Sequence, residues 1–233
     1  MTRHFREAGG QPSGSLDRNG EALTRSPRKA SGSDRRRNNS QAEIKETAAR
    51  LFFESGYEAT SIRNIVDACG LTPPAFYNHF ATKEALLRQI VEDGHATVGA
   101  MMGEAVESAG KSATERLRAL IVAYVRFHTH HQVLALVANA EYSSLTEPSL
   151  SEIRNERVRL RRLFEAIIDD GVRSGEFSLV PVGETLSTRT AAIAIGDMCL
   201  RVAEWYRPDG ALTRDEVETA YAALGLRMVG WQG

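Results

Sequence analysis

Residues Thr60–Lys83 read TSIRNIVDACGLTPPAFYNHFATK, and they predict two short helices joined by a turn. Apolar residues at helical spacing behind Ser61 predict a short amphipathic helix: Ile62, Ile65, Val66 and Cys69. Gly70 follows, where a helix-ending residue with positive φ is easily accommodated. A second short helix, with Thr72 as its cap and Pro73 at its first position, runs to about Phe80. Two short helices joined by a turn with glycine describe a helix-turn-helix unit, whose second helix enters the major groove of DNA.

This stretch and its flanks resemble the TetR family of bacterial transcriptional regulators. The resemblance rests on GYEATSIRNIVDACGL, on Phe76-Tyr77-Asn78-His79-Phe80 and on Thr82-Lys83-Glu84-Ala85-Leu86, and it covers residues 40–91. It implies an all-α fold of about nine helices, with an N-terminal three-helix helix-turn-helix DNA-binding domain and a C-terminal helical ligand-binding and dimerisation domain. We therefore expect a disordered basic tail over residues 1–39, the DNA-binding domain over 40–91, and the effector-binding and dimerisation domain over 92–233.

The bulk composition fits a globular chain of the cytoplasm. The chain has 233 residues, of which 42% are hydrophobic, which is enough for one or two ordinary cores. Its two cysteines are too few for a disulfide framework and lack ligand spacing, which favours a reducing cytosol. The N-terminus lacks the apolar core of a secretory signal, and no apolar stretch is long enough to span a bilayer. We expect no cofactor, no bound metal and no membrane partner.

The net charge of −1 conceals a basic N-terminus. Residues 1–39 hold nine Arg or Lys and four Asp or Glu, a local excess of five positive charges, and they have few bulky apolar side chains. Such a segment cannot bury enough surface to offset its loss of entropy on ordering. It is either a solvated tail or a basic arm, ending in Arg35-Arg36-Arg37, that reaches phosphates. We favour a tail with a modest electrostatic role.

The predicted helix one runs from about Ser40, with Glu43 as its capping partner, to Ser55. In the reading helix Phe76 and Phe80 lie four residues apart and are expected in the core. Asn78 is suited to adenine, whose edge an amide bonds bidentately, while Tyr77 and His79 are expected on phosphates, in keeping with the resemblance. The full set of predicted DNA contacts is Arg37, Ser61, Arg63, Thr72, Pro73, Pro74, Ala75, Tyr77, Asn78, His79 and Lys83.

The rest of the chain is predicted to be helical, with no strand signal. Helix four leaves the DNA-binding domain at Lys83 and continues toward Ala109, so it would couple the two domains. Further helices are expected over about 112–130, 131–145, 150–174 and 183–206, and a last one after the cap Thr213. The last two carry broad apolar faces, and the resemblance implies that they form a four-helix homodimer interface. Its predicted residues are Ala191, Ile195, Leu200, Val217, Ala220, Tyr221, Leu224 and Met228.

An effector pocket is expected between the helices of the second domain, because pockets of helical proteins lie there. Its predicted lining is Met101, Met102, Tyr124, Phe127, His128, Leu134, Tyr142, Arg157, Arg161, Phe164, Met198 and Trp205. Arginines of helix seven either form a solvated face or receive phosphates at the mouth: Arg154, Arg157, Arg159, Arg161 and Arg162. The segment Trp205–Gly210, with Glu176-Phe177 upstream, resembles regulators of lipid and sterol catabolism, some of which respond to acyl-CoA. An apolar effector, either an acyl-CoA or an apolar molecule without CoA, would then release the operator.

Parts of the sequence also invite two other classes of function. A metal-dependent enzyme would use His128, His130 and His131 near Glu141, but no HExxH or GxSxG pattern accompanies them. A redox sensor would use Cys69 and Cys199, but Cys69 is expected on the buried side of its helix, where a thiol is usually inert. The sequence therefore favours a DNA-binding regulator over an enzyme.

Overall fold

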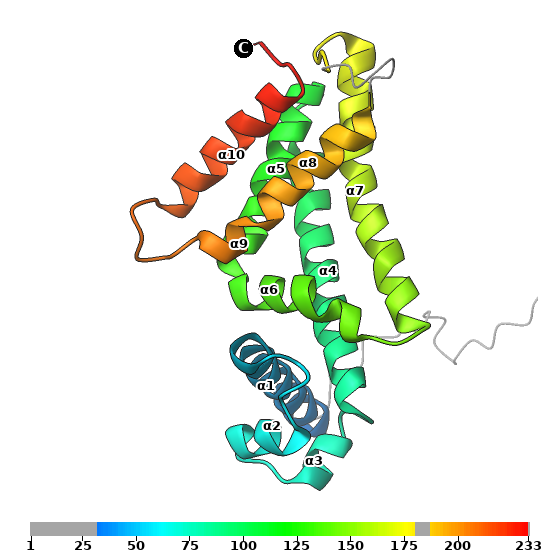
Figure 1. Cartoon of the computed structure of the whole chain (residues 1–233), viewed down its shortest axis with the longest axis vertical. Coiled ribbons are helices and arrows are strands. Elements are labelled where there is room, and N and C mark those ends of the chain that lie inside the picture. The colour runs from blue at the N-terminus through cyan, green and yellow to red at the C-terminus, as the bar shows by residue number, and fades with distance from the viewer. Residues whose placement is uncertain (1–31, 180–186, 233) are drawn as a thin grey trace, which may run out of the picture. The chain divides into compact units, whose positions relative to one another are not determined.

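The computed structural model describes residues 32–179 and 187–232, with side chains from residue 40 onward. These residues are helical, with no strand among them (Figure 1). None of the helices in this part of the chain is long and apolar enough to cross a membrane. The chain divides into a first unit, residues 1–38, and a second unit, residues 39–233, which carries the candidate sites. Residues 1–31 of the predicted tail lie outside the described residues.

Helix α1 spans Gly32–Ser55, so it begins eight residues before the predicted start at Ser40. The capping pattern of Ser40 and Glu43 therefore does not begin this helix. Residues 32–39 after the first glycine contain neither proline nor glycine, and arginine is a good helix former, so nothing in the chain stops the helix there. The predicted end is confirmed: Gly56 follows Ser55 with φ of +83°.

Helices α2 (Ile62–Cys69) and α3 (Pro73–Tyr77) form the predicted helix-turn-helix pair. Ser61 caps α2, because its hydroxyl accepts a hydrogen bond from the Asn64 amide, and Gly70 closes the helix with φ of +65°. Thr72 occupies the cap position of α3, but its hydroxyl makes no capping bond, contrary to the prediction. Helix α3 also ends at Tyr77, three residues before the predicted Phe80.

Helix α4 (Lys83–Ser108) belongs to both hydrophobic clusters of the second unit. Its first turns bury Leu86, Leu87 and Ile90 in the cluster that α1, α2 and α3 complete, while its later turns bury Val98 and Met102 in the second cluster. The first cluster also takes up side chains from beyond residue 91: Val137, Leu145 and Ile153. The predicted helix from Lys83 toward Ala109 is thus confirmed, and the core shared by α1, α2 and α3 extends into residues that the sequence assigned to the second domain.

Helix α5 (Ala113–His130) is the centre of the C-terminal part. It packs against α4, α6 (Gln132–Ala140), α7 (Ser149–Ser174), α8 (Thr188–Leu200), α9 (Val202–Trp205) and α10 (Arg214–Met228), and α8 crosses α5 and α7 (Figure 1). The predicted helix six divides into α6 and the 3-10 helix η1 (Glu141–Ser144), and the predicted helix eight divides into α8 and α9. Residues 183–186 of that prediction lie outside the described residues.

Candidate functional site

Helix α3 is fixed by one buried face and presents the rest of its surface to solvent. Phe76 and Phe80 are almost fully buried, as predicted, and their rings lie 5.7 Å apart. Tyr77 keeps 55% of its surface exposed. The other predicted contacts of this helix are exposed or partly exposed: Thr72, Pro73, Pro74, Ala75, Asn78 and His79. A five-residue helix held by two aromatic anchors therefore displays the predicted DNA-reading residues together.

Helix α2 offers one cation beside this set. The Arg63 side chain is 88% exposed, and its nearest acid is Asp67 at 3.8 Å, a loose surface pair. The Ser61 hydroxyl is already engaged with Asn64 in the helix cap, with 2.5 Å between the Ser61 Oγ and the Asn64 Oδ1. Arg37 is a helical residue of α1 whose side chain lies outside the described part of the structure. Phosphate contacts by these three residues remain predictions.

Lys83 has a structural role that its position in the sequence did not reveal. Its Nζ donates to the carbonyl oxygens of Tyr57 at 2.8 Å and of Thr60 at 3.0 Å, and it lies 4.1 Å from the Tyr57 ring centroid. Two of the three ammonium donors are therefore used to hold the turn between α1 and α2. A phosphate contact by Lys83 would have to use the remaining donor.

A cavity of about 310 Å³ lies among α4, α5, α6, α7 and α8. Six of the predicted effector residues line it: Tyr124, Phe127, His128, Arg157, Arg161 and Phe164. Its walls are mostly apolar, with Val98, Leu160 and Ala192 among them. The cavity is the kind of concave, largely apolar site with a few polar groups that small molecules occupy.

The other predicted effector residues do not line this cavity. Met102 is fully buried in the core, and Met101 lines a separate, more open hollow on α4 and α5. Leu134 packs between the two hydrophobic clusters, and Met198 packs against the second. The Arg157 guanidinium lies over the Tyr142 ring, with 4.6 Å between the guanidinium carbon and the ring centroid. Trp205 is 43% exposed and stacks on Tyr221 of α10, where its indole N–H donates to the Tyr221 hydroxyl at 3.2 Å.

Several cavity residues were missed from the sequence. Helix α8 contributes Ile193, Gly196, Asp197 and Leu200, of which Leu200 had been predicted for the dimer interface. His95 of α4 was missed as well, although a polar residue between Val91 and Val98 in an apolar stripe is a usable signal. The α8 residues carry no such signal, because their place on the cavity depends on how α8 crosses α5 and α7.

Two buried histidines are the most unusual polar groups of the cavity. His95 Nδ1 lies 2.8 Å from the Val91 carbonyl oxygen, and His128 Nδ1 lies 2.7 Å from that of Tyr124. Burial lowers the pKa of both imidazoles, that of His128 to about 4, and the nearby Arg157 charge lowers both further. Burial also raises the pKa of the Tyr124 hydroxyl. The imidazoles are therefore neutral at pH 7.

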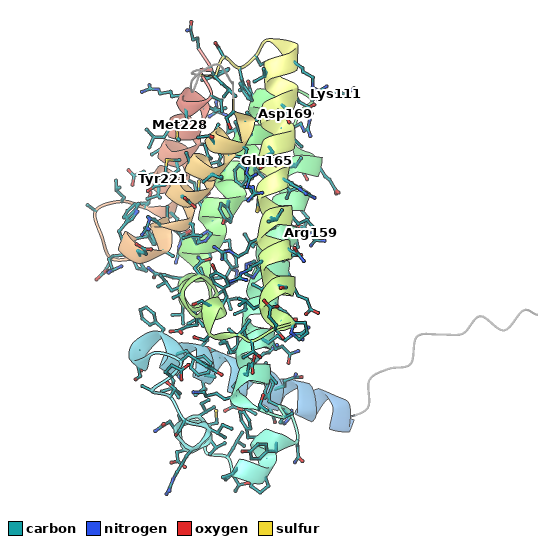
Figure 2. All side chains as sticks on the ribbon, turned by 45° about the vertical axis from the view of Figure 1, so that its right-hand side comes forward. Lys111, Arg159, Glu165, Asp169, Tyr221 and Met228 are labelled. Carbon is teal, nitrogen blue, oxygen red and sulfur yellow. The ribbon has the colours of Figure 1, made fainter. Side chains whose placement is uncertain are left out.

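The arginines of α7 divide between the cavity and the solvent. Arg157 donates to the Asn139 Oδ1 at 3.2 Å, and Arg161 bonds the Glu165 Oε1 at 2.8 Å; both line the cavity. Arg159 pairs with Glu156 of its own helix and lies on the exposed side of α7 (Figure 2). Arg154 and Arg162 are also exposed. These three arginines therefore belong to a solvated helix face. Only Arg157 and Arg161 of the predicted set are placed to receive phosphates at the cavity.

The predicted dimer residues fall into two groups. Ala220, Leu224 and Met228 are exposed along α10, where Figure 2 labels Met228 and Tyr221. Ala191, Leu200 and Tyr221 are partly exposed. Ile195 and Val217 are instead buried in the core of their own chain, because the inner faces of α8 and α10 pack on α5. Those two predictions were wrong.

The alternative sites also have a structural account. His128 belongs to the cavity wall, His130 is exposed with its Nδ1 3.0 Å from the Arg126 carbonyl oxygen, and the His131 ring lies 5.4 Å from that of Phe127. No group of three or more His, Cys, Asp or Glu side chains suited to a metal is found in the described residues. Cys199 is fully buried, which raises its thiol pKa, whereas Cys69 is only partly buried, contrary to the prediction.

Comparison with known families matches both parts of the chain. Residues 44–90 match the family described as bacterial regulatory proteins, tetR family, and residues 110–229 match the tetracyclin repressor-like C-terminal domain. The HTH-type transcriptional repressor KstR2 of Mycobacterium tuberculosis is 28% identical over 190 residues, which cover 81% of this chain and 92% of the relative. The solved structure of this ketosteroid transcriptional regulator superposes with a TM-score of 0.73 at 27% identity, covering 83% of this chain and 95% of that one.

Two further solved structures are similar over nearly their whole length. A tetR-family regulatory protein from Rhodococcus RHA1 has a TM-score of 0.76 and 30% identity, covering 83% of this chain and 98% of that one. AibR, in complex with isovaleryl coenzyme A and operator DNA, has a TM-score of 0.70 and 26% identity, with coverage of 79% and 97%.

Proposed function

Because the chain belongs to the TetR family of bacterial transcriptional regulators, we propose that it is a repressor that binds a palindromic operator as a homodimer and is released by an apolar small molecule. Members of this family act by binding DNA and are not enzymes. The observation that carries the proposal is the surface of α3, where buried Phe76 and Phe80 hold the exposed reading residues in place.

The proposed reading mode follows from the residue types of α3. Tyr77 and His79 bond phosphate oxygens and fix the register of the helix, while Asn78 bonds an adenine edge. Pro73, Pro74 and Ala75 offer apolar contacts that suit thymine methyl groups. A helix of five residues makes few contacts, so a second copy is needed to reach a useful affinity.

The homodimer is proposed through α8 and α10. Large apolar side chains remain exposed on these helices within the single chain: Ile193 on α8, and Leu224 and Met228 on α10. A second copy would bury them by two-fold symmetry and would place two α3 helices on half-sites about one helical turn, roughly 34–36 Å, apart.

The cavity among α4–α8 is the proposed effector site. It joins an apolar wall to two arginines, and Arg forks suit phosphates. AibR, a structural relative, was solved with isovaleryl coenzyme A. We therefore propose an acyl-CoA whose fatty or ring-shaped acyl group enters the cavity and whose phosphates meet Arg157 and Arg161. The second candidate is an apolar effector without CoA, which the existing pairing of Arg161 with Glu165 favours.

The DNA part of the proposal is tested with fluorescence anisotropy on DNA from upstream of the chain's own gene. We expect binding that weakens steeply with salt. Tyr77→Ala should weaken specific and random DNA about equally, whereas Asn78→Ala should relax preference at one base pair. Equal losses on both DNAs for Asn78→Ala would show that Asn78 does not read sequence, and no binding of any DNA at low salt would refute the proposal.

The effector part is tested by titrating the protein–DNA complex with long-chain and steroid-derived acyl-CoAs and with the corresponding free acids. Release by the thioesters and not by the acids supports the acyl-CoA, with Arg157→Gln and Arg161→Gln weakening it. Release by the free acids at the same concentrations supports the second candidate instead. The control is Arg159→Gln, which removes a charge from the exposed side of the same helix.

A further inference from the structure

The two buried histidines define what chemistry the cavity accepts, an inference that rests on the proposed effector site. A backbone carbonyl oxygen can only accept a hydrogen bond. The Nδ1 atoms of His95 and His128, at 2.8 and 2.7 Å from such oxygens, must therefore carry the proton. In a neutral imidazole the other nitrogen is then an acceptor. Each ring thus has its Nε2 lone pair left for another partner.

No protein group among the described residues uses these lone pairs. Neither Nε2 has a hydrogen-bond partner in the part of the chain that the structure describes, and the Tyr124 hydroxyl has none there either. Yet His95 and His128 expose only 6% and 2% of their surface. All three side chains line the cavity, and the Tyr124 and His128 rings meet edge to face at 4.6 Å. Buried polar groups in native proteins are normally paired with protein, water or a ligand, so a polar ligand in the cavity would find partners in the two buried imidazoles and the partly buried Tyr124 hydroxyl.

The charged surroundings keep both imidazoles as acceptors. The positive charge of Arg157 acts on both rings, and it disfavours protonation of either imidazole. Glu156 acts in the other direction on His95, but burial outweighs it. The pKa of each imidazole is therefore lowered, which leaves the neutral form at pH 7.

We propose that the buried end of the effector carries a hydroxyl group, which donates to the Nε2 of His95 or His128 and accepts from the Tyr124 hydroxyl. A saturated hydrocarbon would leave all three groups unpaired. A ketone could accept from Tyr124 but has no proton for either imidazole. A hydroxyl is the small group that satisfies both kinds of partner. The cavity thus discriminates an alcohol from the ketone of the same carbon skeleton.

The tautomers are tested on the ligand-free protein by NMR of the ¹⁵N-labelled histidine rings. We expect Nδ1 protonated and Nε2 unprotonated at pH 7 for both residues, with signals assigned through the spectra of His95→Phe and His128→Phe. Protonation at Nε2, or an imidazolium at this pH, would overturn the proposal. This measurement needs neither an effector nor DNA, so it is independent of the proposed function.

The ligand preference is tested by calorimetry with the isomers of 2-decalol and the matching 2-decalone. The best alcohol should bind at least about tenfold more tightly than its ketone, as expected for one added hydrogen bond in a buried site. The preference should shrink in His95→Phe or His128→Phe. It should persist in His130→Phe, since His130 makes the same backbone contact on the exposed surface.

Equal or tighter binding of the ketone, binding of neither compound, or an alcohol preference that survives both cavity substitutions would overturn the inference. Release of DNA by octanoyl-CoA is measured alongside. If octanoyl-CoA releases DNA while the alcohols show no preference, this inference fails and the proposed function stands. Failure of the protein to bind any DNA would instead refute the proposed function.

Discussion

At the scale of single residues, two cations that flank α3 in the sequence have opposite environments. The Lys83 ammonium bonds the carbonyl oxygens of Tyr57 and Thr60, whereas the Arg63 side chain is 88% exposed beside a single loose acid. A buried carbonyl that loses its donor destabilises the fold, whereas an exposed ion pair contributes little. The two side chains should therefore be separable in their effects on stability and on DNA.

Lys83→Met should lower the free energy of unfolding by about 1–3 kcal/mol, because two carbonyl oxygens lose a charged donor. Arg63→Ala should change it by less than about 0.5 kcal/mol. Arg63→Ala should nevertheless weaken binding to all DNA sequences. It should also reduce the slope of the logarithm of the binding constant against the logarithm of the salt concentration by about one. Urea denaturation and anisotropy at several salt concentrations measure both effects. A stable Lys83→Met variant with weaker DNA binding would contradict this division.

His128 gives the stability a defined pH dependence. Its pKa falls from an ordinary 6.5 to about 4 on folding, because burial disfavours the charged imidazole. Above pH 6.5 the ring is neutral in both states, and between pH 6.5 and pH 4 only the unfolded chain binds the proton. Falling pH therefore favours unfolding across that window, by about 2 kcal/mol between pH 7 and pH 5 for this group.

The matched variant His128→Phe should lack that contribution while His95 and the carboxyl groups still titrate. We expect its free energy of unfolding, measured by urea denaturation, to change less between pH 7 and pH 5 than that of the wild type. Identical pH dependence in the two proteins would mean that His128 keeps its ordinary pKa in the folded state.

At the scale of elements, α4 is held at its first turns by the corner between α6 and α7. Glu84 accepts from the backbone amide and the hydroxyl of Thr146, both at 2.7 Å, and Arg88 bonds Glu152 at 2.7 Å. The Thr146 hydrogen bonds lower the pKa of Glu84. Later in the same helix, Gly94 and His95 line the cavity. One helix therefore carries both the link to that corner and part of the effector site.

Removing the link should weaken the coupling between effector and DNA without abolishing either binding event. For Glu84→Ala combined with Arg88→Ala, we expect the effector-dependent change in DNA affinity to differ from the wild type by about 0.5–2 kcal/mol. Anisotropy with and without the effector found by titration measures it. The control is Arg159→Ala, which breaks an exposed pair within α7. An unchanged coupling in the double variant would exclude these contacts as the route.

At the scale of the whole molecule, local signals predicted most of the fold. Ser61 and Gly70 delimit α2, and the predicted course of α4, α5, α7 and α10 is confirmed to within a residue or two, because caps and glycines act on their neighbours in sequence. The start of α1 was missed because a cap permits a helix to begin but does not forbid an earlier start. Its position depends on what precedes Ser40.

The candidate sites could be predicted best where they depend on one helix, although six of the predicted effector residues also line the cavity among five helices. The exposed face of α3 follows from Phe76 and Phe80, four residues apart. The structural role of Lys83 was missed because its partners lie more than 20 residues earlier in the chain. Ile195 and Val217 were wrongly predicted for the dimer interface. The apolar pattern of a helix face is the same whether that face packs on α5 or on a second copy of the chain. Which surface an apolar face packs against depends on how the helices cross, and the spacing of apolar residues in the sequence does not show that.

The exposed residues that remain on α10 provide the test of the assembled molecule. Leu224 exposes 47% of its surface in the single chain, so Leu224→Glu should leave the fold intact. Buried at a two-fold interface, however, the new carboxylates would have no partners and would oppose association. We expect this variant to sediment as a monomer and to lose operator affinity by about a hundredfold or more, because the second α3 no longer binds within the same complex.

The matched control is Leu163→Glu, which places the same charge on an exposed leucine of α7 outside the proposed interface. It should sediment as the wild type does and keep its DNA affinity. If Leu224→Glu remains dimeric, the interface must lie elsewhere than on α10. If it is monomeric but binds the operator as tightly as the wild type, α3 alone suffices for recognition, and a two-fold operator would no longer be required.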